Sequence, residues 1–218
     1  MNVPEDEKKR LLEAVLPHVM FDGWSDAAIG HAAKELGVDK FHFDRFFPKG
    51  PLDLISYFVE DADNKMEEEL IRRDVASMKI RERITLAVRL RLEIYAPYKD
   101  AIRKALTLMS LPQNAVLGLK LTEGTVSRMW YATGDVSTDI SYYTKRLTLG
   151  AVYSSTLLYW LADGSEGQER SWEFLDRRIE NVMQFETAKF KAKKFLSEKP
   201  KMSFMPSPKR FFQNLKVR

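Results

Sequence analysis

The stretch LTLGAVYSSTLLYWLA, residues 147–162, decides the fold, because it is sixteen residues of helical character without one charged side chain. It follows Lys145 and Arg146 and ends at Asp163. A helix that is apolar nearly all round lies in a large core, crosses a bilayer or encloses an apolar guest. Sixteen residues fall short of the roughly 17–25 that cross a membrane. The sequence therefore leaves two alternatives, a plain core or an apolar guest.

Outward from this stretch the chain is helical in pattern throughout, so we expect an all-α fold without β alternation. The predicted helices cover residues 5–21, 25–37, 39–47, 51 to beyond 66, 79–96, 98–111, 114–132, the apolar segment up to 162, and 170–196. Ser25 and Asp39 are expected N-caps, and Gly37 is an expected stop. Pro17 predicts a kink or an early break in the first helix.

The composition is typical of a globular protein with a hydrophobic core, since 44% of the 218 residues are hydrophobic. The chain contains no cysteine, which excludes disulfides and thiolate metal sites. The first ten residues, MNVPEDEKKR, show neither a signal-type apolar run nor the bias of a transit peptide. From this start we expect the chain to stay in the compartment where it is made, a cytoplasm of bacterial type. The peripheral association with the inner membrane that we also expect rests on the tail and on the resemblance described below.

Charge is distributed unevenly along the chain. Residues 189–218 hold ten basic residues and one acidic residue, whereas residues 1–188 hold 25 basic and 30 acidic residues. A basic tail on an acidic body indicates contact with an anionic partner, and a solvated, solubilising tail is the alternative. Interleaved aromatic and basic residues favour an anionic membrane surface over nucleic acid. The predicted membrane-binding residues are Phe204, Met205, Lys209, Arg210, Phe211, Phe212 and Leu215.

The first three predicted helices resemble the helix-turn-helix head of TetR-type regulators in their spacing of small and apolar residues. Such a head presents its third helix to the major groove. Here that helix is DKFHFDRFF, in which two acidic and two basic groups cancel. Because phosphate neutralisation supplies most non-specific affinity for DNA, we expect a vestigial head that packs and binds no nucleic acid.

The sequence contains few residues in catalytic arrangements. We therefore expect that the protein is not an enzyme and that it has no catalytic residues and no cofactor. The histidines, His18, His31 and His42, have no metal-ligand spacing, and no metal site is predicted. The Glu-x-x-His pairs of di-iron bundles do not occur. Neither a phosphate-binding glycine loop nor a Gly-x-Ser-x-Gly elbow is present.

Several motifs together resemble one family. They are LLEAVLPHVMFDGW, AAKELG and FPKGPLDLISYFVED in the first third, and GDVSTDISYYTKR, LGAVYSSTLLYWLADGS and FLDRRI later. This series is similar to the lipid-binding accessory protein of ubiquinone (coenzyme Q) biosynthesis, the "coenzyme Q nine" family. The resemblance covers about residues 8–190. One departure is Tyr142-Tyr143-Thr144, where the family is expected to have Trp-Tyr-Thr.

The resemblance implies a TetR-like helical bundle that encloses an isoprenoid lipid, works as a peripheral membrane protein and presents a quinone intermediate to a di-iron quinone hydroxylase. The expected lipid-binding residues are Leu147, Tyr153, Leu157 and Trp160. The expected partner-binding residues are Met129, Trp130, Tyr142, Tyr143 and Arg146. For both groups, plain packing in the core is the alternative.

We expect three parts: a helix-turn-helix-like head over residues 1–50, a lipid-binding body over residues 51–198, and a basic amphipathic tail over residues 199–218. By analogy with the regulators, the last two helices offer a surface for a homodimer. The alternative function is a TetR-type transcriptional regulator with an apolar effector.

Overall fold

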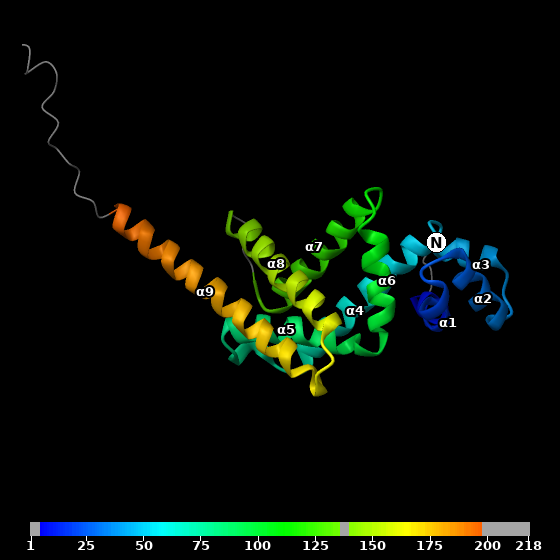
Figure 1. The fold of residues 1–218 in the computed structure, drawn as a ribbon, viewed down its shortest axis with the longest axis horizontal. Helices are drawn as coiled ribbons and strands as arrows, with labels where there is room; N and C mark the ends of the chain where they lie inside the picture. The colour runs from blue at the N-terminus through cyan, green and yellow to red at the C-terminus, as the bar shows by residue number, and fades with distance from the viewer. Residues whose placement is uncertain (1–4, 136–139, 198–218) are drawn as a thin grey trace, which may run out of the picture. The chain divides into compact units, whose positions relative to one another are not determined.

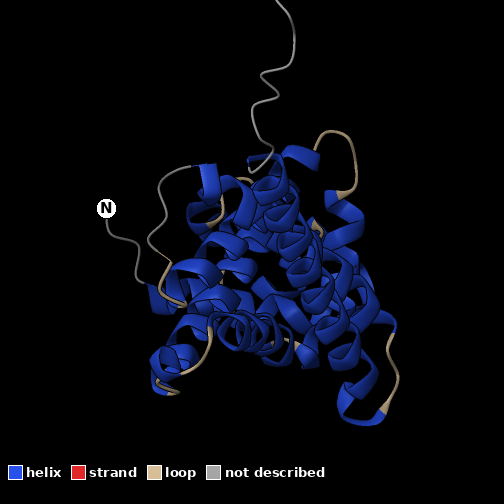
Figure 2. Cartoon of the chain, turned by 90° about the vertical axis from the view of Figure 1, so that its left-hand side faces the viewer, coloured by secondary structure: helices blue, strands red, loops and turns tan. Residues whose placement is uncertain are grey.

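The computed structural model describes residues 5–135 and 140–197, and its secondary structure within these ranges is helical throughout (Figures 1 and 2). The α-helices are α1 (Glu5–Asp22), α2 (Asp26–Leu36), α3 (Lys40–Phe46), α4 (Pro51–Arg72), α5 (Ile80–Ile94), α6 (Lys99–Met109), α7 (Ala115–Ala132), α8 (Ile140–Ala162) and α9 (Glu169–Ser197). Three short 3-10 helices lie at Val75–Ser77, Ala96–Tyr98 and Glu166–Gln168. The chain divides into two units, residues 1–179 and residues 180–218, and the first holds the cavity discussed below.

The ends of the first helices follow the capping residues of the sequence. The Ser25 hydroxyl accepts a hydrogen bond from the N–H of Ala28 at 3.3 Å, and the Asp39 carboxylate accepts one from the N–H of His42 at 2.8 Å. Gly37 ends α2 in the left-handed region, with φ of 65°. These predictions are confirmed. The early break predicted at Pro17 is not found, because α1 continues to Asp22 and buries apolar residues on both sides of the proline.

Helices α1–α3 share one hydrophobic core with α4 and α6. The indole N–H of Trp24 donates to the carbonyl oxygen of Ala101 in α6 at 2.8 Å, and its ring lies 5.3 Å from the ring of Phe58 in α4. The N-terminal head is therefore anchored to the helices that follow it. The division into parts at residues 50 and 198 stays a prediction.

Helix α4 packs against α5 and α7, and α8 packs against α7 and α5. The prediction that the apolar helix is enclosed nearly all round holds for only one side of α8. Its buried residues are Arg146, Leu149, Val152, Tyr153, Thr156, Trp160 and Leu161. Its opposite side exposes Tyr143, Leu147, Ala151 and Leu158, which we call the α8 outer stripe. Within the described ranges, no helix combines the length and the apolar character needed to span a membrane.

Candidate functional site

The candidate site is a cavity of about 100 Å³ between α4, α5, α6, α7 and α8. Most of its wall is apolar, and these residues are Ile55, Phe58, Val59, Leu92, Ile102, Ala105, Leu106, Met109, Leu121 and Leu157. The polar side chains in the wall are Arg91, Thr122, Thr125 and Tyr153. A small pocket with an apolar wall and a few converging polar groups is typical of a site for an apolar ligand with a polar end.

The polar side of the cavity is built on a buried ion pair between α5 and α4. The Arg91 Nε donates to Asp63 Oδ1 at 2.7 Å, and both side chains are less than 10% exposed. The Thr125 hydroxyl donates to the other carboxylate oxygen of Asp63 at 2.9 Å. Burial raises the pKa of the Asp63 carboxyl, whereas the ion pair with Arg91 and the bond from Thr125 oppose this shift. The pairing supplies the compensation that two buried charges require.

Tyr153 reaches the same polar side from α8 and is 6% exposed. Burial raises the pKa of its hydroxyl, so this group is a neutral phenol that can donate and accept. Among the described residues, no hydrogen-bond partner of this hydroxyl is recorded. The cavity therefore carries an uncommitted polar group beside an internally paired Arg91 and Asp63.

The structure brings two of the four sequence-predicted lipid-binding residues to this cavity, Tyr153 and Leu157. Trp160 is fully buried but lies outside the cavity wall, where its indole N–H donates to the side chain of Gln168. Leu147 is 78% exposed and belongs to the α8 outer stripe. The prediction of one cavity lined by all four residues is thus corrected for Trp160 and Leu147, because they lie on other sides of α8.

Sequence reasoning missed Arg91 and Asp63, although both leave a signal in the sequence. Asp63 lies four residues after Val59 and three before Met66, within the apolar stripe of α4. Arg91 likewise lies four residues after the buried Ala87 in α5. Opposite charges on the buried faces of two helices indicate an ion pair, since an unpaired buried charge is very costly.

The five predicted partner-binding residues gather near the end of α7 and the start of α8, but they differ in exposure. Met129 and Arg146 are buried, Trp130 and Tyr142 are partly buried, and Tyr143 is 72% exposed. The Arg146 guanidinium lies 3.4 Å from the centre of the Tyr142 ring, and its Nε donates to the Ser127 hydroxyl at 2.9 Å. Tyr143 and part of Tyr142 are thus accessible to a partner, whereas Met129 and Arg146 are buried beneath this surface.

The seven predicted membrane-binding residues, Phe204, Met205, Lys209, Arg210, Phe211, Phe212 and Leu215, lie outside the described residues.

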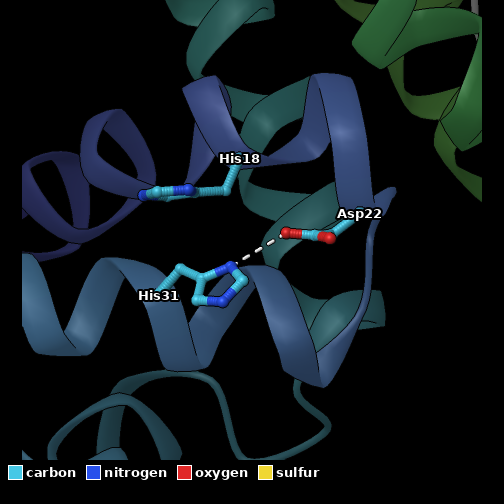
Figure 3. A group of neighbouring side chains, drawn as sticks. All are labelled: His18, Asp22 and His31. Atoms are coloured by element: carbon cyan, nitrogen blue, oxygen red, sulfur yellow. Dashed lines mark hydrogen bonds and ion pairs between the residues drawn. The ribbon is translucent and has the colours of Figure 1, made fainter.

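The head contains a group of metal-ligating side chains that the sequence spacing did not predict (Figure 3). His18 and Asp22 come from α1 and His31 from α2, and their ligand atoms lie within 4.8 Å of one another. Tetrahedral zinc with bonds of about 2.1 Å would hold its ligands about 3.4 Å apart. His31 Nδ1 already lies 2.9 Å from Asp22 Oδ2, and His18 Nε2 lies 3.1 Å from the carboxylate of Glu35. We interpret the group as polar contacts between α1 and α2.

Comparison with known structures defines the class of fold. The chain is similar to a TetR transcriptional regulator from Nitrosomonas europaea, with a TM-score of 0.69 and 16% sequence identity, over 83% of this chain and 99% of that one. At this identity the likeness shows the fold alone. The predicted all-α, TetR-like fold is confirmed.

Comparison with sequences shows which family the chain is similar to. The COQ9 family model matches residues 115–186, which include α7, α8 and part of α9. The ubiquinone biosynthesis protein COQ9-B, mitochondrial, of Xenopus laevis is 34% identical over 82% of this chain and 63% of that protein. The human protein COQ9, mitochondrial, is 32% identical over 82% of this chain and 58% of its own length. The chain is similar to proteins of the COQ9 family over most of its length, and it spans 58–63% of the length of these two relatives.

The same relatives contradict the expected location. We expected a cytoplasmic protein of bacterial type at the inner membrane, whereas the relatives from Xenopus laevis, human and Drosophila melanogaster are all named as mitochondrial. The expectation rested on the first ten residues alone. Those residues cannot outweigh relatives that align with 82–84% of the chain, so the expectation is wrong.

Proposed function

We propose that this chain serves ubiquinone biosynthesis as a lipid-binding accessory protein and not as an enzyme. Its cavity holds part of an isoprenoid quinone intermediate, and the chemistry on the ring belongs to a partner, a di-iron quinone hydroxylase. One observation carries the proposal: a chain similar to the COQ9 family has an apolar cavity lined by Tyr153 and Leu157 at the centre of its helical body.

The cavity must enlarge before it can hold the proposed lipid. An engineered apolar cavity of about 150 Å³ binds benzene, so about 100 Å³ is too small for a whole isoprenoid quinone. Its walls must therefore move apart when the lipid enters. Met109 lies in the wall, and its unbranched thioether side chain can adopt several shapes. Burial of the isoprenoid chain then favours binding by roughly 25 cal/mol per Å² of apolar surface removed from water.

The hydroxylase docks, in this proposal, on the surface around Tyr142 and Tyr143. Aromatic side chains with a polar tip are enriched at interfaces, and Tyr143 is open to solvent. Replacing both tyrosines by alanine should weaken co-purification with the hydroxylase while leaving the melting temperature nearly unchanged. An unaffected complex contradicts this surface.

Contact with an anionic membrane surface is assigned to the basic tail. Deleting residues 200–218 should abolish sedimentation of the chain with anionic liposomes, and binding that survives places the membrane contact elsewhere. We also propose a homodimer through the outer sides of α8 and α9, by analogy with the fold of the regulators. Analytical ultracentrifugation of the full chain measures this association, and a monomer at all concentrations contradicts it.

The alternative, a transcriptional regulator, receives no support from the charges on α3. The Lys40 ammonium, which could neutralise a phosphate, forms an ion pair with Asp26 at 2.9 Å. His42 Nε2 lies 2.8 Å from the carboxylate of Glu7. A DNA gel shift at moderate salt is expected to show no sequence-dependent retention.

The decisive test of lipid binding uses two neighbouring leucines of α8. Leu157 lines the cavity, whereas Leu158 is exposed on the α8 outer stripe. Leu157→Trp should fill the cavity and abolish co-purification of isoprenoid lipid, detected by native mass spectrometry. Leu158→Trp adds the same volume outside the cavity and should retain the lipid. If both variants carry lipid as the unmodified chain does, the cavity is not the site.

A further inference from the structure

One helix in the wall of the cavity, α6, is shorter than the others. It has 11 residues, whereas the other wall helices, α4, α5, α7 and α8, have between 15 and 23. The chain is broken on both sides of α6, by the 3-10 helix that contains Pro97 and by the turn that contains Pro112 (Figure 1). Because of these breaks, α6 can change its position without bending a longer helix.

The N-terminal half of α6 is anchored on two sides by hydrogen bonds. The Lys99 ammonium donates to the carbonyl oxygen of Trp160 in α8 at 2.8 Å. The Lys104 ammonium donates to the carbonyl oxygen of Met20 in α1 at 2.8 Å. The indole of Trp24 donates to this half as well. This part of α6 is therefore fixed both to the head and to α8.

The C-terminal half of α6, residues 105–109, is held less closely. Among the described residues, no recorded hydrogen bond joins it to another α-helix, and Asn114 in the following turn donates to the carbonyl oxygen of Leu108 at 2.9 Å. Exposure also rises along the buried side of α6, from 2% at Ala101 to 9% at Met109. The C-terminal half can therefore move away from α7 without breaking a recorded hydrogen bond to another helix.

Met109 closes the wall against α7 at Gly118. A β-carbon added to Gly118 would lie 3.1 Å from the β-carbon of Met109, so the two helices approach this closely because residue 118 has no side chain. Both residues also line the cavity. We call the contact of Met109 with Gly118 the α6–α7 seam.

The surface beside the α6–α7 seam is apolar. Leu111, Val116 and Leu119 are 40%, 65% and 72% exposed, and residues 105–119 contain no charged side chain. A path for an apolar molecule needs such a surface, because covering a charge with the molecule would be costly. The seam therefore has apolar side chains on both its outer and its inner side.

We propose that the α6–α7 seam is the entrance of the cavity and that the C-terminal half of α6 is its lid. Residues 105–109 move away from α7 about the anchored N-terminal half, Met109 leaves Gly118, and the isoprenoid chain enters between the two helices. The same movement enlarges the cavity of about 100 Å³. This inference rests on the proposed lipid-binding function and adds to it the path that the lipid takes.

A first experiment wedges the seam open. Gly118→Ala places a methyl group against Met109, whereas Gly124→Ala, on the same helix, places one where no atom of another element lies within 4 Å. Both changes raise helix propensity alike, so the difference between them isolates the seam. Native mass spectrometry of the full chain, at successive times after mixing, measures uptake of a ubiquinone with two isoprene units.

Gly118→Ala should speed this uptake about 5-fold, because overpacking raises the free energy of the closed seam and not that of the open one. Gly124→Ala should take up the quinone at the rate of the unmodified chain. Thermal unfolding verifies that both variants are folded. Equal rates for the two variants overturn the inference.

A second experiment locks the seam. The chain contains no cysteine, so Met109→Cys combined with Gly118→Cys allows one intramolecular disulfide. The separation of 3.1 Å between the two β-carbon positions must grow by a few tenths of an ångström to reach the roughly 3.5–4.5 Å of a disulfide. The oxidised protein should lose uptake of the quinone, and a reductant should restore it. Quinone loaded before oxidation should stay bound through a dilution that empties the reduced protein.

Loss of uptake together with retention of the loaded quinone supports a lid, because a distorted site would lose the quinone as well. Uptake by the oxidised protein at the rate of the reduced protein overturns the inference, and so does release of the loaded quinone at the rate of the reduced protein. If the unmodified chain binds no quinone at all, the proposed function fails and this inference fails with it.

Discussion

Two buried tyrosines, Tyr95 and Tyr153, lie near Arg91. They differ in whether the hydroxyl has hydrogen-bond partners, and this difference distinguishes a structural residue from a candidate binding residue. The Tyr95 hydroxyl lies 2.9 Å from the carbonyl oxygen of Phe58 and 2.7 Å from the carboxylate of Asp61, and its ring packs edge-on against Phe58. The Tyr153 hydroxyl has no recorded partner among the described residues and faces the cavity. A polar group whose hydrogen bonds are formed within the protein stabilises the fold. A polar group at a cavity without one is available to a ligand.

The largest effect on stability is expected at the buried ion pair between Arg91 and Asp63, which lies near both tyrosines. Arg91→Ala leaves the Asp63 carboxylate buried without its partner, and it should lower the free energy of unfolding by about 3–5 kcal/mol. Urea denaturation of the full chain measures this change. Arg72→Ala is the control, because Arg72 pairs with Glu68 and Glu69 on the surface and should cost at most about 0.5 kcal/mol. A loss below about 1 kcal/mol for Arg91→Ala would show that the pair is not enclosed.

Removing one hydroxyl from each tyrosine tests the comparison directly. Tyr95→Phe removes the hydroxyl that lies within hydrogen-bond distance of the Phe58 carbonyl and the Asp61 carboxylate, so it should cost about 1–2 kcal/mol. Tyr153→Phe removes a hydroxyl that has no recorded partner and should change stability by less than about 0.5 kcal/mol. Urea denaturation of both variants at one pH gives the two values. Equal losses would mean that Tyr153 is as structural as Tyr95.

Another polar group with several partners, like Tyr95, lies between α8 and α9, where the Asp163 carboxylate accepts hydrogen bonds from Ser165 and Ser171 at 2.6–3.0 Å. Burial raises the pKa of Asp163, but these bonds together outweigh it and hold the pKa well below its ordinary value. Asp163→Asn should cost about 1 kcal/mol at neutral pH.

The pH dependence of this cost follows from the lowered pKa. The ionised carboxylate contributes its full stabilisation above the pKa of the unfolded chain, about 3.9, and the contribution is lost as the pH falls through the folded pKa. The difference in unfolding free energy between the two proteins should be constant above about pH 5 and shrink below about pH 4. A difference that grows on acidification contradicts the assignment.

A small effect is expected at the exposed ion pair between His31 and Asp22 in the head. His31 is open to solvent and lies 2.9 Å from Asp22, so His31→Ala should cost at most about 1 kcal/mol. Equimolar zinc should leave the melting temperature of the unmodified chain unchanged, because His31 Nδ1 and the Asp22 carboxylate already contact each other at 2.9 Å. A rise in melting temperature that His31→Ala removes would instead establish a zinc site.

Many helix positions and ends were predicted correctly from the sequence, because these features depend on neighbouring residues. Ser25, Gly37 and Asp39 act within one helical turn, so their capping roles follow from the neighbouring residues alone. The early break at Pro17 was wrong because the buried side of α1 is held by distant helices, a contribution that local propensity omits.

The site was predicted less completely. The resemblance implied Tyr153 and Leu157 as lipid-binding residues, and both line the cavity, although lipid binding by them stays a prediction. Trp160 and Leu147 were assigned to the same cavity, although they lie on other sides of α8. Arg91 and Asp63 were missed because each is an ordinary charged residue until the two helices are packed together.

By itself the sequence determined the helices, most of their ends and the resemblance to one family, since periodicity, capping and motif order are properties of neighbouring residues. Only the tertiary structure decided which side of α8 faces the cavity and which polar groups there have partners. The physical reason is that burial and hydrogen bonding are relations between helices far apart in the chain: Asp63, Arg91, Thr125 and Tyr153 come from four different helices.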